Sequence, residues 1–383
     1  MESIVEDAVN RVAEQQGSST DDGTPEVPTG EEDVGTSDEE LEELLDGLNT
    51  DVTVLGCGGA GTNTVDRLQK ADIAGADFYA INTDAQHLLN SEIDNKVLVG
   101  ENLTKGLGSG SLPQVGEKAA KESEPELRQI VEGEDLVFVT CGLGGGTGTG
   151  SAPVVARYAR EAGALAIAVV TLPFTVEGDV RMKNAEAGLA RLRDAAHTTV
   201  VIPNDKLLDI APQLPLNSAF RVADEVLLRS IKGITEMVTT PGLVNLDFAD
   251  LQTVMKKGGV AMIGLGEAEG EGRTREAIEE ALHSPLIDVD VSQATGALIN
   301  VVGGPQMTIK EAESVAHEVF DNVQPDSRII WGCGVDEDLE GEIRTMVVVT
   351  GVESSQILGP DKKAKHKAKQ KATETGDDPD FVL

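Results

Sequence analysis

The stretch Gly144-Gly145-Gly146-Thr147-Gly148-Thr149-Gly150 decides the fold of this chain. It follows an apolar, strand-like segment at 135–140 (DLVFVT) and precedes a helix-like segment at 151–161 (SAPVVARYARE). Glycines let a backbone approach a ligand closely and adopt positive φ. Successive N–H groups and a helix start attract phosphate. Because both flanks are apolar and regular, the pattern favours a phosphate-binding turn over a flexible linker.

Strand-like and helix-like segments alternate around this turn, beginning at residue 51. Such alternation predicts an α/β domain with a parallel sheet and helices on both faces. Strands are predicted near 52–56, 77–81, 96–99, 135–140, 164–171 and 198–203, and helices near 60–70, 114–131, 151–162 and 178–195. A long helix follows from Ser218 to about Val238, with apolar residues on most of its sides.

A second, smaller unit is predicted from about 250 to 358. Strands and helices are again mixed in it, which indicates a small α+β domain. The predicted strands lie near 259–265, 296–303, 327–334 and 342–351, and the predicted helices near 272–283 and 308–322.

The chain is strongly acidic, with a net charge of −36 from 67 acidic and 31 basic residues. Residues 51–360 alone hold 46 acidic and 24 basic residues, so the excess is not confined to a tail. This charge argues against nucleic-acid binding. Molar salt shortens the Debye length to about 3 Å and screens the repulsion within such a surface. The sequence therefore predicts a halophilic protein, with an ordinary acidic protein as the alternative.

The compartment is predicted from the cysteines and the apolar runs. Cys57, Cys141 and Cys333 have no CxxC spacing and are odd in number, which argues against a disulfide framework and for a reducing compartment. The longest apolar run, 162–174, is too short to span a bilayer. We expect a cytoplasmic protein without a transmembrane segment.

A second glycine-rich turn, at 56–61 (GCGGAG), follows the strand at 52–55. Its GxGxxG pattern, with Asp84 as a ribose carboxylate, suggests an NAD-dependent enzyme when taken alone. Such an enzyme would not need the richer turn at 144–150. Two turns at the carboxyl ends of two parallel strands instead indicate one ligand with several phosphates. The GxxxxGK[ST] pattern of P-loop nucleotidases does not occur in the sequence.

The run at 144–150 resembles the signature of the tubulin superfamily. Further segments resemble FtsZ, the family of cell-division GTPases: 57–63 (CGGAGTN), 82–84 (NTD), 173–178 (PFTVEG), 203–208 (PNDKLL) and 242–250 (GLVNLDFAD). The resemblance covers about residues 40–358, and the acidity is similar to that of archaeal, halophilic members. It implies a Rossmann-like GTPase domain with a parallel sheet, a long central helix and a smaller α+β C-terminal domain.

The resemblance implies five segments along the chain. They are an acidic, disordered extension over 1–36, a GTP-binding domain with a leading helix over 37–216, the central helix over 217–240, the catalytic loop with the C-terminal domain over 241–358, and a short disordered tail over 359–383.

Nucleotide contacts are implied position by position. The residues that match the family's first and second nucleotide loops and its phosphate cradle are Gly58, Gly59, Ala60, Gly61, Asn63, Asn82, Asp84, Gly142, Gly144, Gly145, Gly146, Thr147, Gly148, Thr149 and Gly150. Those that match contacts to ribose and base are Glu177, Arg181, Asn204, Phe220 and Asp224. A carboxylate suits guanine, because the base offers N1–H and a 2-amino group as donors. Core packing is the alternative role for Phe220.

Asn245, Asp247 and Asp250 match the family's catalytic loop. The two aspartates share a face at a helix start and are spaced to orient water for attack on a γ-phosphate. Complementing the helix dipole is the alternative. The helix from 224 to about 238 is ~21 Å long, so these aspartates should act on the nucleotide of a neighbouring copy. Such head-to-tail contacts build filaments.

The function implied is GTP-dependent assembly into filaments of the mid-cell division ring. GTP and GDP are the ligands, Mg²⁺ accompanies the triphosphate, and no separate metal site is expected. The expected partners are further copies of the chain and adaptor proteins that link the ring to the membrane. A tubulin-like scaffold for cell shape with weak hydrolysis is the alternative. The lysine-rich segment 362–371 either replaces the family's tethering peptide or only balances charge.

Overall fold

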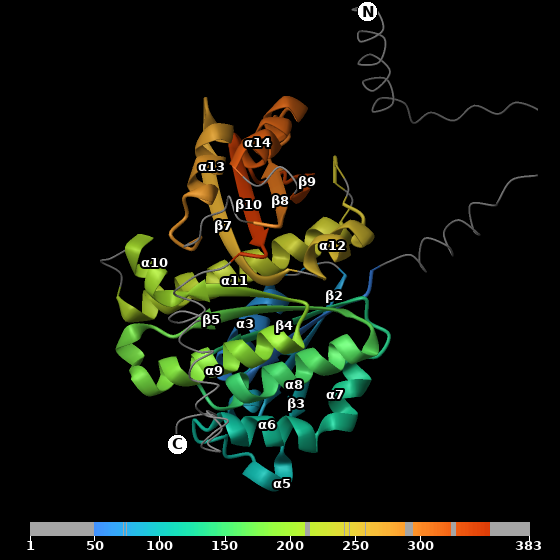
Figure 1. Cartoon of the computed structure of the whole chain (residues 1–383), viewed down its shortest axis with the longest axis vertical. Coiled ribbons are helices and arrows are strands. Elements are labelled where there is room, and N and C mark those ends of the chain that lie inside the picture. The colour runs from blue at the N-terminus through green and yellow to red at the C-terminus, as the bar shows by residue number, and fades with distance from the viewer. Residues whose placement is uncertain are drawn as a thin grey trace, which may run out of the picture. The chain divides into compact units, whose positions relative to one another are not determined.

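The computed structural model describes residues 50–71, 73, 75–210, 215–240, 242–244, 246–256, 258–287, 294–322 and 327–352. The predicted extension over 1–36, the leading helix that was predicted to follow it and the tail over 359–383 lie outside these residues. The strands and helices of the described part are shown in Figure 1.

The first six strands are all parallel and follow the order β3-β2-β1-β4-β5-β6. They match the predicted segments to within two residues. Their bounds are Val52–Cys57 (β1), Ala76–Asn82 (β2), Asn95–Leu98 (β3), Leu136–Gly142 (β4), Leu165–Leu172 (β5) and Thr198–Pro203 (β6). The helices between them are Gly58–Lys70 (α3), Ala85–Asn90 (α4), Glu101–Thr104 (α5), Pro113–Glu122 (α6), Glu124–Val131 (α7), Thr147–Ala162 (α8) and Asp179–Ala195 (α9), with a 3₁₀ turn at Thr175–Glu177 (η1).

Apolar side chains cover both faces of this sheet. Phe138 and Ile167 pack with residues of α3 on one face, whereas Val139 and Ala168 pack with residues of α8 and α9 on the other. Alternate residues of a strand point to opposite faces, so a continuous apolar strand needs helices on both sides. The predicted α/β arrangement is confirmed.

Two helix boundaries differ from the prediction. The single helix expected over 114–131 is two helices, α6 and α7, that meet at Ser123. Pro125 lies in the first turn of α7, where its missing N–H is tolerated, but it cannot continue α6. Helix α8 begins at Thr147 rather than near 151, so the second half of the glycine run is the first turn of a helix.

The second half of the chain extends the same sheet. β6 pairs in parallel with β7 from Thr198↔Gly259 to Val200↔Ala261, and the described strands form one ten-stranded sheet that continues β7-β10-β8-β9. The remaining elements are Asn204–Ile210 (α10), Leu216–Thr239 (α11), Phe248–Met255 (α12), Gly259–Glu269 (β7), Arg273–Leu282 (α13), Gly296–Gly303 (β8), Ile309–Asn322 (α14), Arg328–Val335 (β9) and Glu342–Thr350 (β10). The sequence suggested two separate units and did not predict this continuity.

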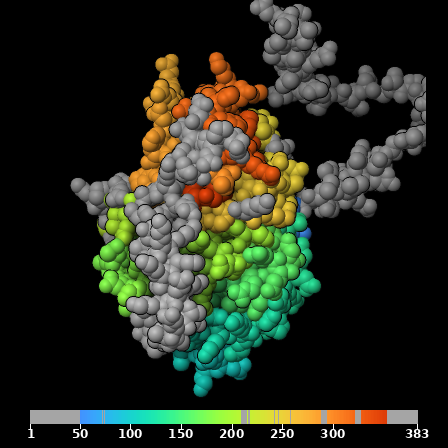
Figure 2. All heavy atoms as spheres, viewed as in Figure 1, coloured from blue at the N-terminus to red at the C-terminus, as the bar shows by residue number. Residues whose placement is uncertain are grey.

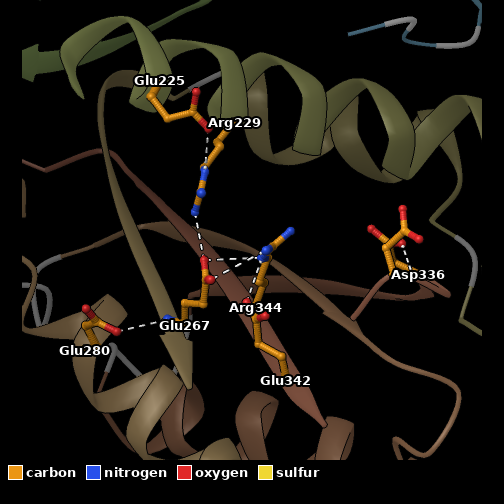
Figure 3. A network of polar contacts seen from close by, with 8 residues as sticks. Glu225, Arg229, Glu267, Glu280, Asp336, Glu342 and Arg344 are labelled. Carbon is orange, nitrogen blue, oxygen red and sulfur yellow. Dashed lines mark hydrogen bonds and ion pairs between the residues drawn. The ribbon is translucent and has the colours of Figure 1, made fainter. Parts of the chain in front are cut away.

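The long central helix α11 is tied to the second half by ionic contacts. Arg229 on α11 donates to Glu225 at 3.0 Å and to Glu267 of β7 at 2.9 Å, and Arg344 of β10 lies 3.2 Å from the same Glu267 carboxylate (Figure 3). A cavity of about 660 Å³ lies beside these residues and is also lined by Asn300. Because these side chains are about 40% exposed, the contacts orient α11 more than they stabilise it.

Two further features concern the molecular surface and the ability of the helices to cross a membrane. Figure 2 shows α12, in yellow, as part of the molecular surface. Over the described part of the chain, every helix is too short or too polar to cross a membrane.

Candidate functional site

The two glycine turns lie directly against one another. They follow the neighbouring parallel strands β1 and β4, whose register pairs Gly56 with Thr140. A Cβ atom on Gly58 would lie 2.7 Å from the backbone N of Gly148, and one on Gly148 would lie 2.8 Å from the carbonyl oxygen of Cys57. Only glycine permits this contact. The starts of α3 and α8 therefore meet, and their N–H groups offer one positive field to an anion.

A cluster of three hydroxyls lies beneath the turns. Thr147 Oγ1 lies 2.6 Å from Thr83 Oγ1 and 3.0 Å from Ser109 Oγ, and all three residues are buried. The cluster joins the first turn of α8 to the segment after β2 and to the loop before α6. Thr147 was predicted to contact the phosphates, but its partners Thr83 and Ser109, which lie 64 and 38 residues away along the chain, were not predicted.

Thr149 has an internal partner. Its Oγ1 accepts a hydrogen bond from the backbone N–H of Gly144 at 2.9 Å, and the side chain is fully buried. Gly144 has a φ of 105°, a conformation that favours glycine. A Cβ atom on Gly145, in contrast, would have no heavy atom within 4 Å. Thr149 thus fixes the turn from inside, and Gly145 presents its backbone to open space.

The segment after β2 forms the next wall of the site. The Asn82 side chain is buried and bonds within the chain: its Oδ1 accepts from the N–H groups of Thr83 and Asp84, and its Nδ2 lies 3.1 Å from Nδ1 of His87. Asp84 caps α4 by accepting from the His87 N–H at 3.0 Å. Both residues were predicted to contact the nucleotide, and in the structure both shape the loop. Gly59, Ala60 and Asn63 are exposed on the first turns of α3.

The predicted ribose contacts gather around η1. Glu177 accepts from the backbone N–H of Phe174 at 2.9 Å and forms an ion pair with Arg181. The Phe174 ring is buried and meets the Phe220 ring edge to face, with centroids 5.0 Å apart. Phe220 remains 38% exposed, so packing against Phe174 covers only part of it and leaves surface for a planar base.

Two polar groups suit the recognition of a base and a sugar. Asp224 on α11 is half-buried and pairs with Arg67 of α3 at 3.4 Å. Burial raises the pKa of Asp224 above its ordinary value, and the nearby Arg67 opposes that shift. Asn204, at the start of α10, is buried, and its Oδ1 has no hydrogen-bond partner in the part of the chain described. Buried polar atoms are rarely left unpaired, so this oxygen is suited to a ligand.

The predicted catalytic aspartates lie away from the glycine turns. Asp247 caps α12 by accepting from the Ala249 N–H at 3.2 Å, and Asp250 lies in the first turn of α12. Both are exposed, and the Asp250 carboxylate has no partner among the described residues. Figure 1 shows α10 and α12 at opposite ends of α11. From Asp224 to Thr239, α11 rises about 22 Å. Asn245 lies outside the described residues.

The donor set fits a nucleotide better than a protein-held metal. The described residues contain no group of three or more His, Cys, Asp or Glu side chains that could hold a metal ion. Mg²⁺ bound with a triphosphate needs only one or two carboxylates besides the phosphates and water. Two facing helix starts, an open backbone at Gly145 and the unpaired Asn204 oxygen fit the phosphates and the sugar or base of one ligand.

Two family models match the chain over separate regions, and known proteins are similar to it over most of its length. The model described as "Tubulin/FtsZ family, GTPase domain" matches residues 51–212, and "FtsZ family, C-terminal domain" matches residues 259–353. Cell division protein FtsZ 1 of Halobacterium salinarum is 58% identical over 371 residues, which cover 95% of this chain and 93% of that protein. Cell division protein FtsZ of Haloferax mediterranei is 59% identical over 94% of this chain and 95% of its own length. The solved FtsZ dimer of M. jannaschii has a TM-score of 0.79 at 54% identity, and the match covers 82% of this chain and 92% of that chain.

Proposed function

The chain belongs to the tubulin/FtsZ family, and we propose that it assembles head to tail into filaments of the cell-division ring. Its GTPase domain binds GTP and GDP and hydrolyses GTP. High identity to cell-division proteins of two halophilic archaea supports the division role over a role in cell shape.

One observation carries the proposal that hydrolysis needs two copies. The first half of α11 contacts the predicted nucleotide-binding residues, since Phe220 meets Phe174 and Asp224 pairs with Arg67 of α3. The exposed Asp250 lies beyond the other end of α11, which rises about 22 Å from Asp224 to Thr239. A side chain cannot cover that span. The aspartates of one subunit must therefore meet the nucleotide of the next, so that filament growth and hydrolysis are linked.

Each group then has a stated task. The glycine turns, from Gly58 to Gly61 and from Gly142 to Gly150, hold the phosphates through backbone N–H groups. Asp250 and Asp247, together with Asn245, orient water for attack on the γ-phosphate of the neighbouring subunit. Mg²⁺ bound with the triphosphate supplies neutralising charge there.

The base and ribose are held by the groups near the start of α11. Asp224 accepts from the N1–H and 2-amino group of guanine, and the exposed part of the Phe220 ring lies against the base. Asn204 offers its unpaired oxygen to the sugar or base, and the Glu177–Arg181 pair borders the ribose.

The experiment compares Asp250→Ala with wild type in GTP binding and in phosphate release, over a range of protein concentrations in molar KCl with Mg²⁺. Light scattering follows assembly. The variant should bind GTP normally and hydrolyse almost none, whereas the specific rate of wild type should rise above a threshold concentration. Full turnover by Asp250→Ala, or a wild-type rate independent of concentration, would refute the shared site.

Mixing two variants provides a second test of the site shared between subunits. Asp224→Ala should bind GTP poorly but keeps Asp250, so it can complete the site of an Asp250→Ala neighbour. An equimolar mixture should therefore release more phosphate than either variant alone. Thr253→Ala, which changes another exposed side chain of α12, serves as the control variant.

The proposed division role also implies where the filaments lie and which other proteins they contact. We propose that the filaments lie in the cytoplasm at mid-cell and that adaptor proteins link them to the membrane. A fluorescent fusion of the full chain should form a band at the division site. A diffuse signal in dividing cells would contradict this placement.

A further inference from the structure

His87 lies beside the first glycine turn and has no task in the function proposed above. It belongs to α4, which follows β2, and its side chain is half-buried. A Cβ atom built on Gly59 would lie 3.8 Å from Cε1 and 4.0 Å from Nε2 of this ring. The edge of the imidazole therefore faces the exposed first turn of α3.

The hydrogen bonds of Asn82 assign the proton on this imidazole. Asn82 Oδ1 accepts from the N–H of Thr83 at 2.9 Å and from that of Asp84 at 3.3 Å. The Nδ2 of the same amide then faces Nδ1 of His87 at 3.1 Å and donates to it. Nδ1 is thus the acceptor, and Nε2 carries the N–H. Within the residues that the structure describes, Nε2 has no hydrogen-bond partner.

The order of the strands indicates which part of a nucleotide reaches this N–H. Strands β6, β5, β4, β1 and β2 are successive neighbours in the sheet. Asn204 follows β6, Glu177 follows β5, the two glycine turns follow β4 and β1, and His87 follows β2. A nucleotide with its base at the β6 side and its phosphates over the turns ends beside β2. The phosphate nearest His87 is the last one.

We infer that the Nε2–H of His87 donates a hydrogen bond to the terminal phosphate of GTP and so discriminates GTP from GDP. The inference rests on the proposed nucleotide-binding geometry of the same site. GDP lacks the phosphate that this donor reaches, so the contact contributes to binding of the triphosphate alone. A hydrogen bond to a charged group of this kind corresponds to roughly a tenfold difference in affinity, about 1.4 kcal/mol.

Equilibrium binding tests the inference with the full chain in molar KCl and Mg²⁺, below the concentration at which it assembles. The probes are GDP and a GTP analogue with a non-hydrolysable β–γ bridge. His87→Ala should bind the analogue about tenfold more weakly and GDP within about twofold of wild type. His87→Gln, whose amide N–H can reach a similar position, should recover most of the loss. Leu89→Ala, exposed on the same helix, is the matched control and should bind both probes like wild type.

Three outcomes would contradict the role of His87 or the nucleotide-binding function on which it rests. An equal loss for the analogue and GDP would overturn the inference, since it would mean that His87 acts only by holding Asn82. Unchanged binding of both probes by His87→Ala would also overturn it. Wild-type protein that binds neither probe would instead refute the nucleotide-binding function itself.

Discussion

Thr149→Val tests whether the phosphate turn is held from inside. The Thr149 Oγ1 accepts the N–H of Gly144 at 2.9 Å, and both residues are buried. Valine has nearly the same shape, so the substitution creates no cavity but leaves the Gly144 N–H without a partner. An unsatisfied buried donor costs about 1–3 kcal/mol. We expect a loss of about 2 kcal/mol and, at roughly 2–4 °C per kcal/mol, a melting temperature lower by roughly 4–8 °C.

Thr140→Val is the matched control for this prediction. Thr140 lies on the neighbouring strand β4 and is also fully buried, but its Oγ1 has no hydrogen-bond partner among the described residues. Replacing an unpaired hydroxyl with a methyl group removes a buried polar atom, so stability should be unchanged or slightly increased. The opposite responses of two buried threonines would separate the hydrogen bond from a general effect of the substitution.

The assay is thermal unfolding of both variants without nucleotide, in molar KCl, followed by equilibrium binding of GTP. Thr149→Val should unfold earlier and also bind GTP more weakly, because the turn loses its anchor. If Thr149→Val melts like wild type and loses only GTP affinity, the hydroxyl contacts the ligand and not Gly144, and the reasoning is refuted.

Three further predictions concern charge. Glu311→Gln should destabilise the protein to urea by about 2 kcal/mol, because the almost buried Arg273 of α13 donates to both Glu311 oxygens at 2.9 and 3.2 Å. These bonds lower the pKa of Glu311 to about 2, so the stability that the ion pair contributes is fully present above the ordinary glutamate pKa of 4.5 and is lost as pH falls toward 2. If Glu311→Gln and wild type lost the same stability on acidification, this reasoning would be contradicted. Because burial raises the pKa of Asp224, GTP affinity should fall on acidification at a higher pH than for an ordinary aspartate, and Arg67→Ala should raise that midpoint further in a binding titration. Melting should occur at a higher temperature in molar KCl than in dilute salt, since salt screens the repulsion of a chain with net charge −36; equal melting temperatures would exclude a halophilic surface.

The predicted site residues show how much a local sequence pattern reveals about a binding site. The glycine run at 144–150 and the GCGGAG turn predicted two phosphate-binding turns at strand ends, and the structure places them against each other. The contact of each turn with a ligand is still a prediction. The pattern did not separate Gly145, which faces open space, from Thr149, whose hydroxyl is used inside the turn. The residue type determines which hydrogen bonds a side chain can form. The neighbouring backbone groups decide whether those hydrogen bonds remain available to a ligand.

The sequence by itself determined the strands, most helices and the α/β class, because apolar runs and glycine positions are local signals that require no knowledge of distant residues. The helix break at Ser123 is also encoded locally, by Pro125, although a single helix was predicted over 114–131. Tertiary structure alone decided that β7 continues the sheet from β6, and that Thr83 and Ser109 meet Thr147. It also placed His87 beside Gly59. Strand order and register bring such residues together from distant parts of the chain. The periodicity of a single segment contains no information about these contacts.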